Sequence, residues 1–471
     1  MTQNARALAP RPRSRGQMTL LVRSAIGTLG GLALINSVWP VWRSWFPMEI
    51  DVNESWNSFH ADAFIQGLTL YPDKTSLIVN NYPPLSYYLI GYLSLLSWDA
   101  VAIGRTLSLM ALAAICAAIA VCIRSLGGSR CAALVACLWY WTTMVRFNDA
   151  YVGMNDPQLP ALAISLTGLA WYVSRQQRQR SAIAPIMLMA LAGFYKHTLI
   201  AAPLTTVLHL ARRDFRAAVL TTAAGLTVAG VGLALCTLVY GKVFIAQLMM
   251  ARAWSLSAAL ESLAQLQFIL PAMLIWGVWA WSERKTEASR FTTIHIAVSF
   301  VVFFLQKMGD GVDKNATFDL MAATAIGLGI SFSRAEVSPF GRRFGLHIAQ
   351  ATILGLLLVR LLLSNHLESY YLLARADYRR EFSENAAVFE QEVVRIRSIP
   401  GPVSCTLMTV CRRAGKTFVY DSFAMSQRVK TGVLTANELT AEVAARMIRF
   451  EPIDSRAATK VLQRKVLAFA R

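Results

Sequence analysis

Apolar stretches separated by short polar ones fill most of the chain from residue 18 to residue 363. A helix of about 20 apolar residues crosses a bilayer, and several of these stretches approach that length. The pattern predicts eleven helical segments, at 18–39, 105–124, 131–143, 159–173, two within 181–211, 217–240, 264–281, 291–306, 317–332 and 344–363. We therefore expect an α-helical polytopic membrane domain over residues 1–364.

The apolar residues 181–211 lie between two basic clusters, at 175–180 and 212–216. Clusters of Lys and Arg mark the cytoplasmic side, so a segment with both ends there crosses an even number of times. Two helices of about 15 residues would each be about 22 Å long, short of a hydrocarbon core of roughly 30 Å. Their junction, Tyr195-Lys196-His197, is expected to lie below the outer surface in a cavity.

The longest polar interruption in this domain, residues 51–88, lies in a first outer loop over about residues 43–103. Bulky and small residues recur in it at helical spacing, namely Trp56, Phe59, Ala63 and Gly67. The spacing predicts a short helix in the plane of the membrane interface. Pro83 and Pro84 then push the backbone at Tyr82 into an extended form. The tyrosine-rich stretch after them is too short to cross, which predicts a second surface or re-entrant helix.

The chain becomes polar and amphipathic from Asn365 onward. Its pattern predicts a helix at 376–397, strands near 403–407 and 417–420, and a helix opened by a T-x-x-E capping box at Thr435. These elements indicate a small α/β domain over residues 365–471. An odd number of spans places it on the same side of the membrane as the first loop.

The composition agrees with a membrane protein, with 55% hydrophobic and 15% charged residues. A soluble chain carries nearer a quarter charged residues. The formal net charge of +19 comes from short basic clusters between apolar stretches, which is typical of orientation signals and not of a nucleic-acid surface. Arg11, Arg13 and Arg15 place the N-terminus in the cytoplasm. We expect an inner-membrane location with the first loop and the C-terminal domain on the periplasmic side.

Cys405 and Cys411 are the two of seven cysteines that lie in the polar C-terminal stretch. An oxidising compartment outside the membrane would favour a disulfide between them. Six steps of extended strand span about 20 Å, far more than a disulfide tolerates. A disulfide therefore requires a turn within residues 406–410, and the sequence leaves both outcomes open.

An ordered set of motifs extends over residues 18–335. It comprises DVNESW, then Gly67 and Tyr71, NYPPLSYYLIGYL, Gly104-Arg105, MNDPQLPALAISLTGLAWY and GFYKHTLIAAPL. The set resembles the GT-C glycosyltransferases of the family 39 and family 83 type, which include protein O-mannosyltransferases and aminoarabinose transferases. Two departures concern the acceptor: the acidic motif is D-V-N-E, and Asn81-Tyr82 replaces the lysine that precedes Pro-Pro in aminoarabinose transferases.

The resemblance implies a GT-C fold, a sugar donor carried on a polyprenyl phosphate, and an active site at the outer membrane face. It also implies that the acidic residue of the first loop, here Asp51, is catalytic. The expected partners are the polyprenyl-phosphate sugar, membrane lipids and an acceptor outside the cytoplasm, which is a lipid, a glycan or a protein.

Asp51 and Glu54 have two interpretations. Their D-x-x-E spacing is also that of a helix-capping box. A polyprenyl phosphate is a good leaving group, so a transferase needs one base for the acceptor hydroxyl and a cation near the departing phosphate. Asp51 fits the base, and Glu54 could assist it or hold a divalent cation with Asp51 and Asp156, although carboxylates alone do not establish a metal site.

The expected substrate-binding residues are polar groups of the outer loops and of the short-helix junction, namely Asp156, Lys196, His197, Tyr82, Arg252 and Asp313. Most have a structural alternative. Lys196 and His197 could be interface anchors, Asp156 could cap the fourth span, Arg252 could be an ordinary loop charge, and Asp313 could belong to an ordinary turn.

A transporter or flippase for a lipid or glycan is the rival function. Transporters usually have two related halves and charged residues in mid-membrane. This sequence has no internal repeat, and its polar groups gather in the outer loops. These features favour the transferase.

Overall fold

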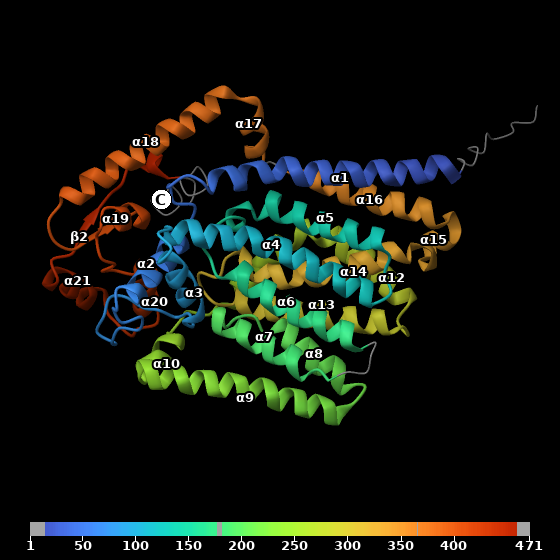
Figure 1. Cartoon of the computed structure of the whole chain (residues 1–471), viewed down its shortest axis with the longest axis horizontal. Helices are drawn as coiled ribbons and strands as arrows, with labels where there is room; N and C mark the ends of the chain where they lie inside the picture. Colours follow the sequence, from blue (N-terminus) through green and yellow to red (C-terminus); the bar gives the residue numbers. More distant parts are fainter. Residues whose placement is uncertain (1–14, 177–180, 365, 459–471) are drawn as a thin grey trace, which may run out of the picture.

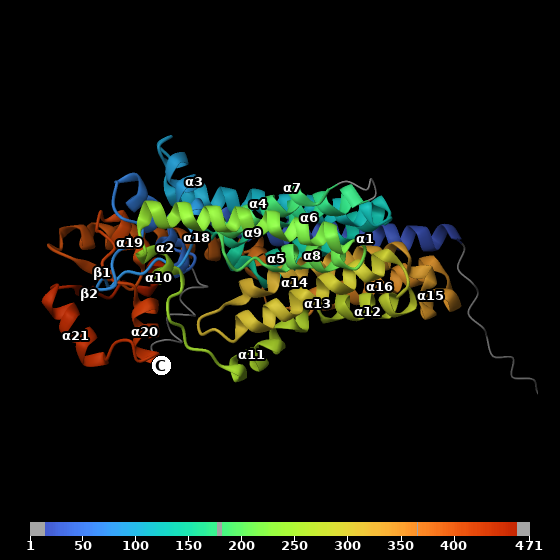
Figure 2. The ribbon, with the colours of Figure 1, turned by 90° about the horizontal axis from the view of Figure 1, so that it is seen from below.

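The computed structural model describes residues 15–176, 181–364 and 366–458. A bundle of helices follows the long axis of the molecule, and the C-terminal segment covers one end of the bundle together with the first loop (Figure 1). Figure 2 shows the same arrangement from below. Four of the arginines behind the predicted orientation lie outside the described residues: Arg11, Arg13, Arg178 and Arg180.

A helix occupies each predicted segment of the membrane domain. These helices are α1 (Arg15–Arg43), α4 (Ala100–Ser125), α5 (Arg130–Phe147), α6 (Gln158–Gln176), α7 (Ile183–Tyr195), α8 (Ala201–Ala211), α9 (Phe215–Tyr240), α12 (Leu270–Ser282), α13 (Glu287–Lys307), α14 (Phe318–Ser333) and α16 (Leu346–Leu362). Short helices between them are η1 (Asp149–Tyr151), α10 (Val243–Leu248), α11 (Leu256–Ser262), η2 (Leu263–Phe268), η3 (Lys314–Thr317), η4 (Ala335–Val337) and α15 (Pro339–Phe344).

Five helices in the described part of the chain are long and apolar enough to cross a membrane. A sixth span results if α11 and η2 are counted with α12, from which they are bent by 83°. The chain is therefore a multi-pass membrane protein. That the shorter helices also cross, as eleven spans require, stays a prediction.

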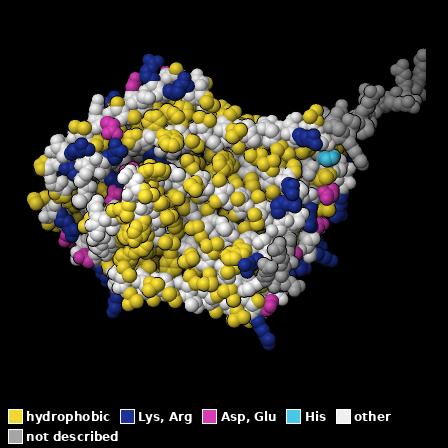
Figure 3. Space-filling view, viewed as in Figure 1, with side chains coloured by type: hydrophobic (Ala, Val, Ile, Leu, Met, Phe, Trp, Pro, Cys, Tyr) yellow, Lys and Arg dark blue, Asp and Glu magenta, His cyan; other side chains and the backbone are white. Residues whose placement is uncertain are grey.

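Burial separates the centre of the bundle from its surface. The stretch Lys314–Ser333, which comprises η3 and α14, has 94% of its most apolar 18 residues buried. α14 packs against α4, α5, α12 and α13. In α9 only 6% is buried, and apolar side chains such as Leu238 are exposed. Figure 3 shows a broad hydrophobic surface over the bundle, with charged side chains gathered towards the two ends. Such a surface suits contact with lipid tails.

The first loop forms the two predicted helices, α2 (Val52–Ile65) and α3 (Leu85–Ser94). α2 ends before Gly67, whose φ of +69° is a left-handed conformation that favours glycine. The C-terminal segment packs over one side of α2 and buries Phe59. That α2 lies in the plane of the membrane interface stays a prediction. The end of α3 and the turn after it do expose apolar side chains, namely Tyr92, Leu95, Leu96 and Trp98.

The C-terminal segment combines helices with a small parallel sheet. Its elements are α17 (Glu368–Ala374), α18 (Ala376–Ser398), β1 (Val403–Cys405), α19 (Met408–Arg413), α20 (Ser422–Lys430), α21 (Ala436–Ala445), β2 (Arg449–Glu451) and η5 (Ser455–Ala457). Val403 pairs with Arg449 in the β1–β2 register. The segment shares its core with the bundle, since Trp39 of α1 packs edge-on against Phe382 of α18 at 5.5 Å.

The structure confirms α18 and the Thr435–Glu438 capping box. The predicted strand at 417–420 is wrong, because β1 pairs with β2 instead. Residues 417–420 have no regular secondary structure, and Phe418 stacks on Phe59 of α2 at 5.0 Å. Their apolar character therefore reflects packing on the first loop.

A disulfide joins Cys405 and Cys411, whose Cα atoms are 5.7 Å apart. The chain turns at residues 406–407, where β1 ends and α19 begins. The turn that the sequence required is thus a strand-to-helix change of direction, which needs neither Gly nor Pro.

Candidate active site

Asp51 is buried at the start of α2, where it caps the helix. Its backbone is extended, with φ −155° and ψ 153°, and its Oδ1 accepts a hydrogen bond from the Asn53 N–H at 3.1 Å. The side chain of the cap residue thereby satisfies one of the unpaired N–H groups of the first turn. Capping leaves a carboxylate with further acceptor capacity, so the structural role does not exclude a chemical one.

Glu54 does not close a capping box with Asp51. Its carboxylate instead forms a bidentate pair with Arg105 of α4, with Nε–Oε1 and Nη2–Oε2 distances of 2.7 Å each. The backbone N–H groups of Ile50 and Asn155 donate to the same two oxygens at 3.1 Å each. Four donors on a fully buried carboxylate indicate that Glu54 holds α2 against α4 and is poorly suited to accept a substrate proton.

Gly104 lets Asn155 complete this arrangement. A Cβ atom at Gly104 would overlap the Asn155 side chain. That side chain donates to the Glu54 carbonyl at 3.4 Å and to the Ser58 hydroxyl at 2.9 Å. The Gly104-Arg105 motif therefore serves one function, since glycine admits Asn155 and arginine pairs with Glu54.

Gly104→Ala is expected to destabilise the protein by about 1–3 kcal/mol, because the new methyl group must displace Asn155 in a packed site. Thermal unfolding in detergent measures the effect. Gly277→Ala is the matched control, because Gly277 is also helical and no atom lies within 4 Å of the place that its new methyl group would take. It should be neutral or slightly stabilising. Equal shifts in the two variants would contradict this account of the motif.

Lys196 and Asp156 form a buried ion pair, with Nζ and Oδ1 3.4 Å apart. The Lys196 ammonium also lies over the Tyr82 ring, 4.8 Å from its centroid. The other carboxylate oxygen of Asp156 is buried and has no hydrogen-bond partner among the described residues. Lys196, at the junction of α7 and α8, is thus buried in the protein against Tyr82 and Asp156. That this junction lies in a cavity below the outer membrane surface stays a prediction.

Tyr151 of η1 connects this ion pair to Asp51 and Asp313. Its hydroxyl donates to Asp313 Oδ2 at 3.2 Å. Burial, together with the nearby charges of Asp313, Asp156 and Asp51, raises the pKa of Tyr151 well above its ordinary value. Tyr151, which the sequence analysis did not select, therefore bonds to Asp313 and is close enough to Asp156 and Asp51 for their charges to act on it.

His197 and Arg252 lie on the Tyr82 side of this group. The rings of His197 and Tyr82 are 6.2 Å apart, and His197 is close enough to Lys196 and Arg252 to interact with their charges. Arg252 lies over the Phe423 ring at 5.4 Å, and burial lowers the pKa of its guanidinium. The structure thus places basic groups around Tyr82, beside the carboxylates around Tyr151.

The C-terminal segment contributes Asp421, which the sequence analysis missed. Its Oδ2 accepts a hydrogen bond from Trp56 Nε1 of α2 at 2.9 Å. Burial raises the pKa of Asp421 to about 6, although hydrogen bonds from Ala424 and Trp56 favour the charged form. Within residues 15–176, 181–364 and 366–458, no group of three His, Cys, Asp or Glu side chains could hold a metal ion.

Residues 79–308 match a family model described as a 6-pyruvoyl-tetrahydropterin synthase related domain and membrane protein. No curated protein matches the sequence.

Two solved structures of ArnT from Cupriavidus metallidurans are similar over nearly the whole chain. The complex with undecaprenyl phosphate has 13% identity and a TM-score of 0.58, covering 93% of this chain and 90% of ArnT. The apo form has 13% identity and a TM-score of 0.57, covering 92% and 89%. The Archaeoglobus fulgidus oligosaccharyltransferase has 11% identity and a TM-score of 0.47, covering 84% of this chain and 62% of that one. The chain therefore has the fold of the two ArnT structures.

Proposed function

We propose that this protein transfers one sugar from a polyprenyl-phosphate donor to an acceptor hydroxyl at the outer face of the membrane. The observation that carries the proposal is the grouping around Tyr151 and Tyr82. Asp51, a carboxylate fixed at the start of α2, and Asp156, which pairs with the buried Lys196, are both close enough to Tyr151 to act on its charge.

Asp51 is the proposed base. It removes the proton from the acceptor hydroxyl as the acceptor oxygen forms a bond to the anomeric carbon. The bond from that carbon to the phosphate oxygen breaks, and polyprenyl phosphate leaves with the electron pair. Glu54 and Arg105 hold α2 so that Asp51 faces the reacting atoms, which is a positioning function.

Lys196 is the proposed partner of the departing phosphate, with His197 and Arg252 close by. A phosphate that approached Lys196 would compete with Asp156 for its ammonium, and the negative charge that develops on the leaving group would strengthen the new interaction. ArnT, which shares this fold, has been solved with undecaprenyl phosphate bound, and this supports a lipid phosphate as part of the donor. Asp156, Tyr82 and Asp313 would then line the site.

Lys196→Gln is expected to reduce the affinity for undecaprenyl phosphate by about tenfold or more, since a charge-assisted hydrogen bond to phosphate is lost. Native mass spectrometry of the purified protein with added undecaprenyl phosphate measures the bound fraction. Lys242→Gln is the matched control, because Lys242 is exposed in the turn before α10. Unchanged lipid binding in Lys196→Gln would contradict the assignment of Lys196.

A further inference from the structure

α19 is a helix of six residues that contacts the chain on both sides of Asp51. The backbone N–H of Thr409 donates to the Glu49 carboxylate at 3.0 Å, and the Thr409 hydroxyl bonds to that of Ser55. Glu49 and Thr409 are buried, as is Ser55. Thr409 therefore bonds to the side chains of Glu49, two residues before Asp51, and of Ser55, in the first turn of α2 after it.

Arg412 of the same helix holds the other end of α2. Its guanidinium donates to both carboxylate oxygens of Asp62, at 2.7 and 3.1 Å. A third bond, at 2.9 Å, reaches Asp99, the cap of α4. The Arg412 side chain is only 10% exposed, so solvent screens these bonds less than those of a surface pair. Arg105 also belongs to α4. α2 is therefore held against the bundle both by α19 and by Arg105.

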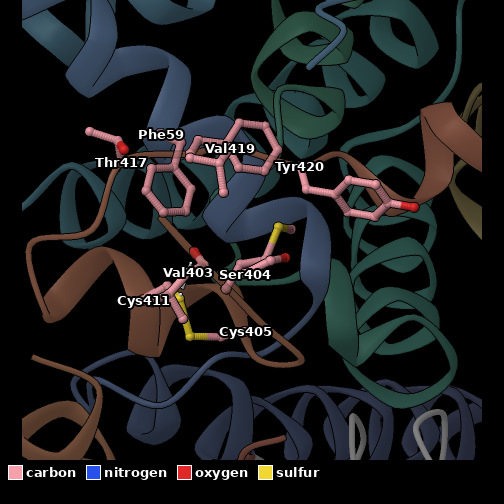
Figure 4. Close-up of a pocket in the computed structure, with 10 residues that line it drawn as sticks. Phe59, Val403, Ser404, Cys405, Cys411, Thr417, Val419 and Tyr420 are labelled. Carbon is pink, nitrogen blue, oxygen red and sulfur yellow. Dashed lines mark hydrogen bonds between the residues drawn. A yellow bond between two sulfur atoms is a disulfide. The ribbon is translucent and has the colours of Figure 1, made fainter. Parts of the chain in front are cut away.

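The disulfide closes the chain around this contact. Cys405 ends β1, and Cys411 lies between Thr409 and Arg412 in α19. Figure 4 shows the disulfide beside Phe59 of α2, where both line the same small pocket. Reduction would remove the covalent link between the two sulfur atoms and leave α19 joined to β1 through residues 406–407 and through their shared buried cluster. The disulfide therefore contributes part of the free energy that keeps α19 oriented towards α2.

We propose that α19, held by the Cys405–Cys411 disulfide, is a positioning element for Asp51, so that reduction of the disulfide lowers the turnover number and leaves the bundle folded. The inference rests on the proposed function, because it assigns Asp51 to the reacting site. A dithiol reductant supplies the two electrons and two protons, becoming a disulfide itself while Cys405 and Cys411 become thiols. A small displacement of Asp51 is enough, because a misplacement of about 1 Å in an active site can lower the rate by on the order of a hundredfold.

Hydrogen exchange and transfer kinetics test the proposal on the purified full chain in detergent, with and without dithiothreitol, well below the unfolding temperature. On reduction we expect the α2 amides of residues 55–60 to exchange at least about tenfold faster. The kcat of sugar transfer should fall by about tenfold to a hundredfold at a nearly constant KM for the donor. Cys405→Ser/Cys411→Ser should reproduce both effects and no longer respond to dithiothreitol. Unchanged α2 exchange, or unchanged kcat with faster exchange, would overturn the proposal.

Arg412→Gln and Arg413→Gln form a matched pair in α19. Arg413 is exposed and pairs with Glu390 of α18, away from α2. We expect Arg412→Gln to lower kcat like reduction does and Arg413→Gln to keep wild-type kcat. Equal kcat values in the two variants would also overturn the proposal. If the oxidised wild-type protein transferred no sugar at all, the proposed function would fail, and α2 exchange alone would decide whether the disulfide positions α2.

Discussion

Asp51→Asn is expected to lower the rate of sugar transfer by a factor of about 10² to 10⁴, the usual cost of losing a general base. Asparagine caps a helix about as well as aspartate, so the bond from the Asn53 N–H can persist and α2 can still form. An amide cannot take the acceptor proton. The measurement is kcat with a polyprenyl-phosphate sugar donor, together with the thermal unfolding temperature, which should stay close to that of the wild type.

Asp214→Asn is the control for this substitution. Asp214 caps α9 in the same way, with its Oδ1 accepting from the Ala217 N–H at 2.9 Å, and it is exposed and remote from Tyr151. Its variant should keep both wild-type turnover and stability. Turnover near the wild-type value in Asp51→Asn would refute the assignment of the base and direct attention to Asp156.

Glu54→Gln is expected to destabilise the protein by about 3–5 kcal/mol, because it leaves the buried Arg105 without its carboxylate partner. The free energy of unfolding, measured by denaturant titration of the detergent-solubilised protein, reports this loss. Glu442→Gln provides the comparison, since Glu442 pairs with Arg446 on an exposed face of α21 and its loss should cost less than about 1 kcal/mol.

The same experiment distinguishes the two roles considered for Glu54, which are positioning and proton transfer. A positioning residue loses stability on substitution, and activity falls with it. A Glu54→Gln protein with wild-type stability but no transfer would instead assign the proton transfer to Glu54 itself.

The sequence predicted the helices well, because each apolar stretch has its own hydrophobic pattern and needs no partner to be recognised. The order of motifs predicted a GT-C fold that the structural comparison supports at only 13% identity. Residues 417–420 were mispredicted as a strand because apolar residues that pack on Phe59 have the same local pattern as a buried strand. Pairing between β1 and β2 joins residues more than 40 positions apart, which local pattern cannot reveal.

The candidate site was predictable only in part, for the same reason. Asp51, Asp156 and Lys196 come from polar motifs between apolar stretches, and the structure brings them into one neighbourhood. The sequence placed Glu54 beside Asp51 in a catalytic pair, but it could not reveal the contact of Glu54 with Arg105, 51 positions away, which favours a positioning role. Tyr151 and Asp421 were missed, although Tyr151 lies in the same polar loop as Asp156.

The cell-envelope glycans of three strains provide the most direct test of the proposed transfer, because mass spectrometry detects the added sugar whichever acceptor carries it. The strains lack the gene, carry it, or carry it as Asp51→Asn. The proposal predicts an envelope component that is heavier by one sugar residue in the strain with the wild-type gene and unmodified in the other two. Identical glycan masses in all three strains, or full modification by Asp51→Asn, would contradict it.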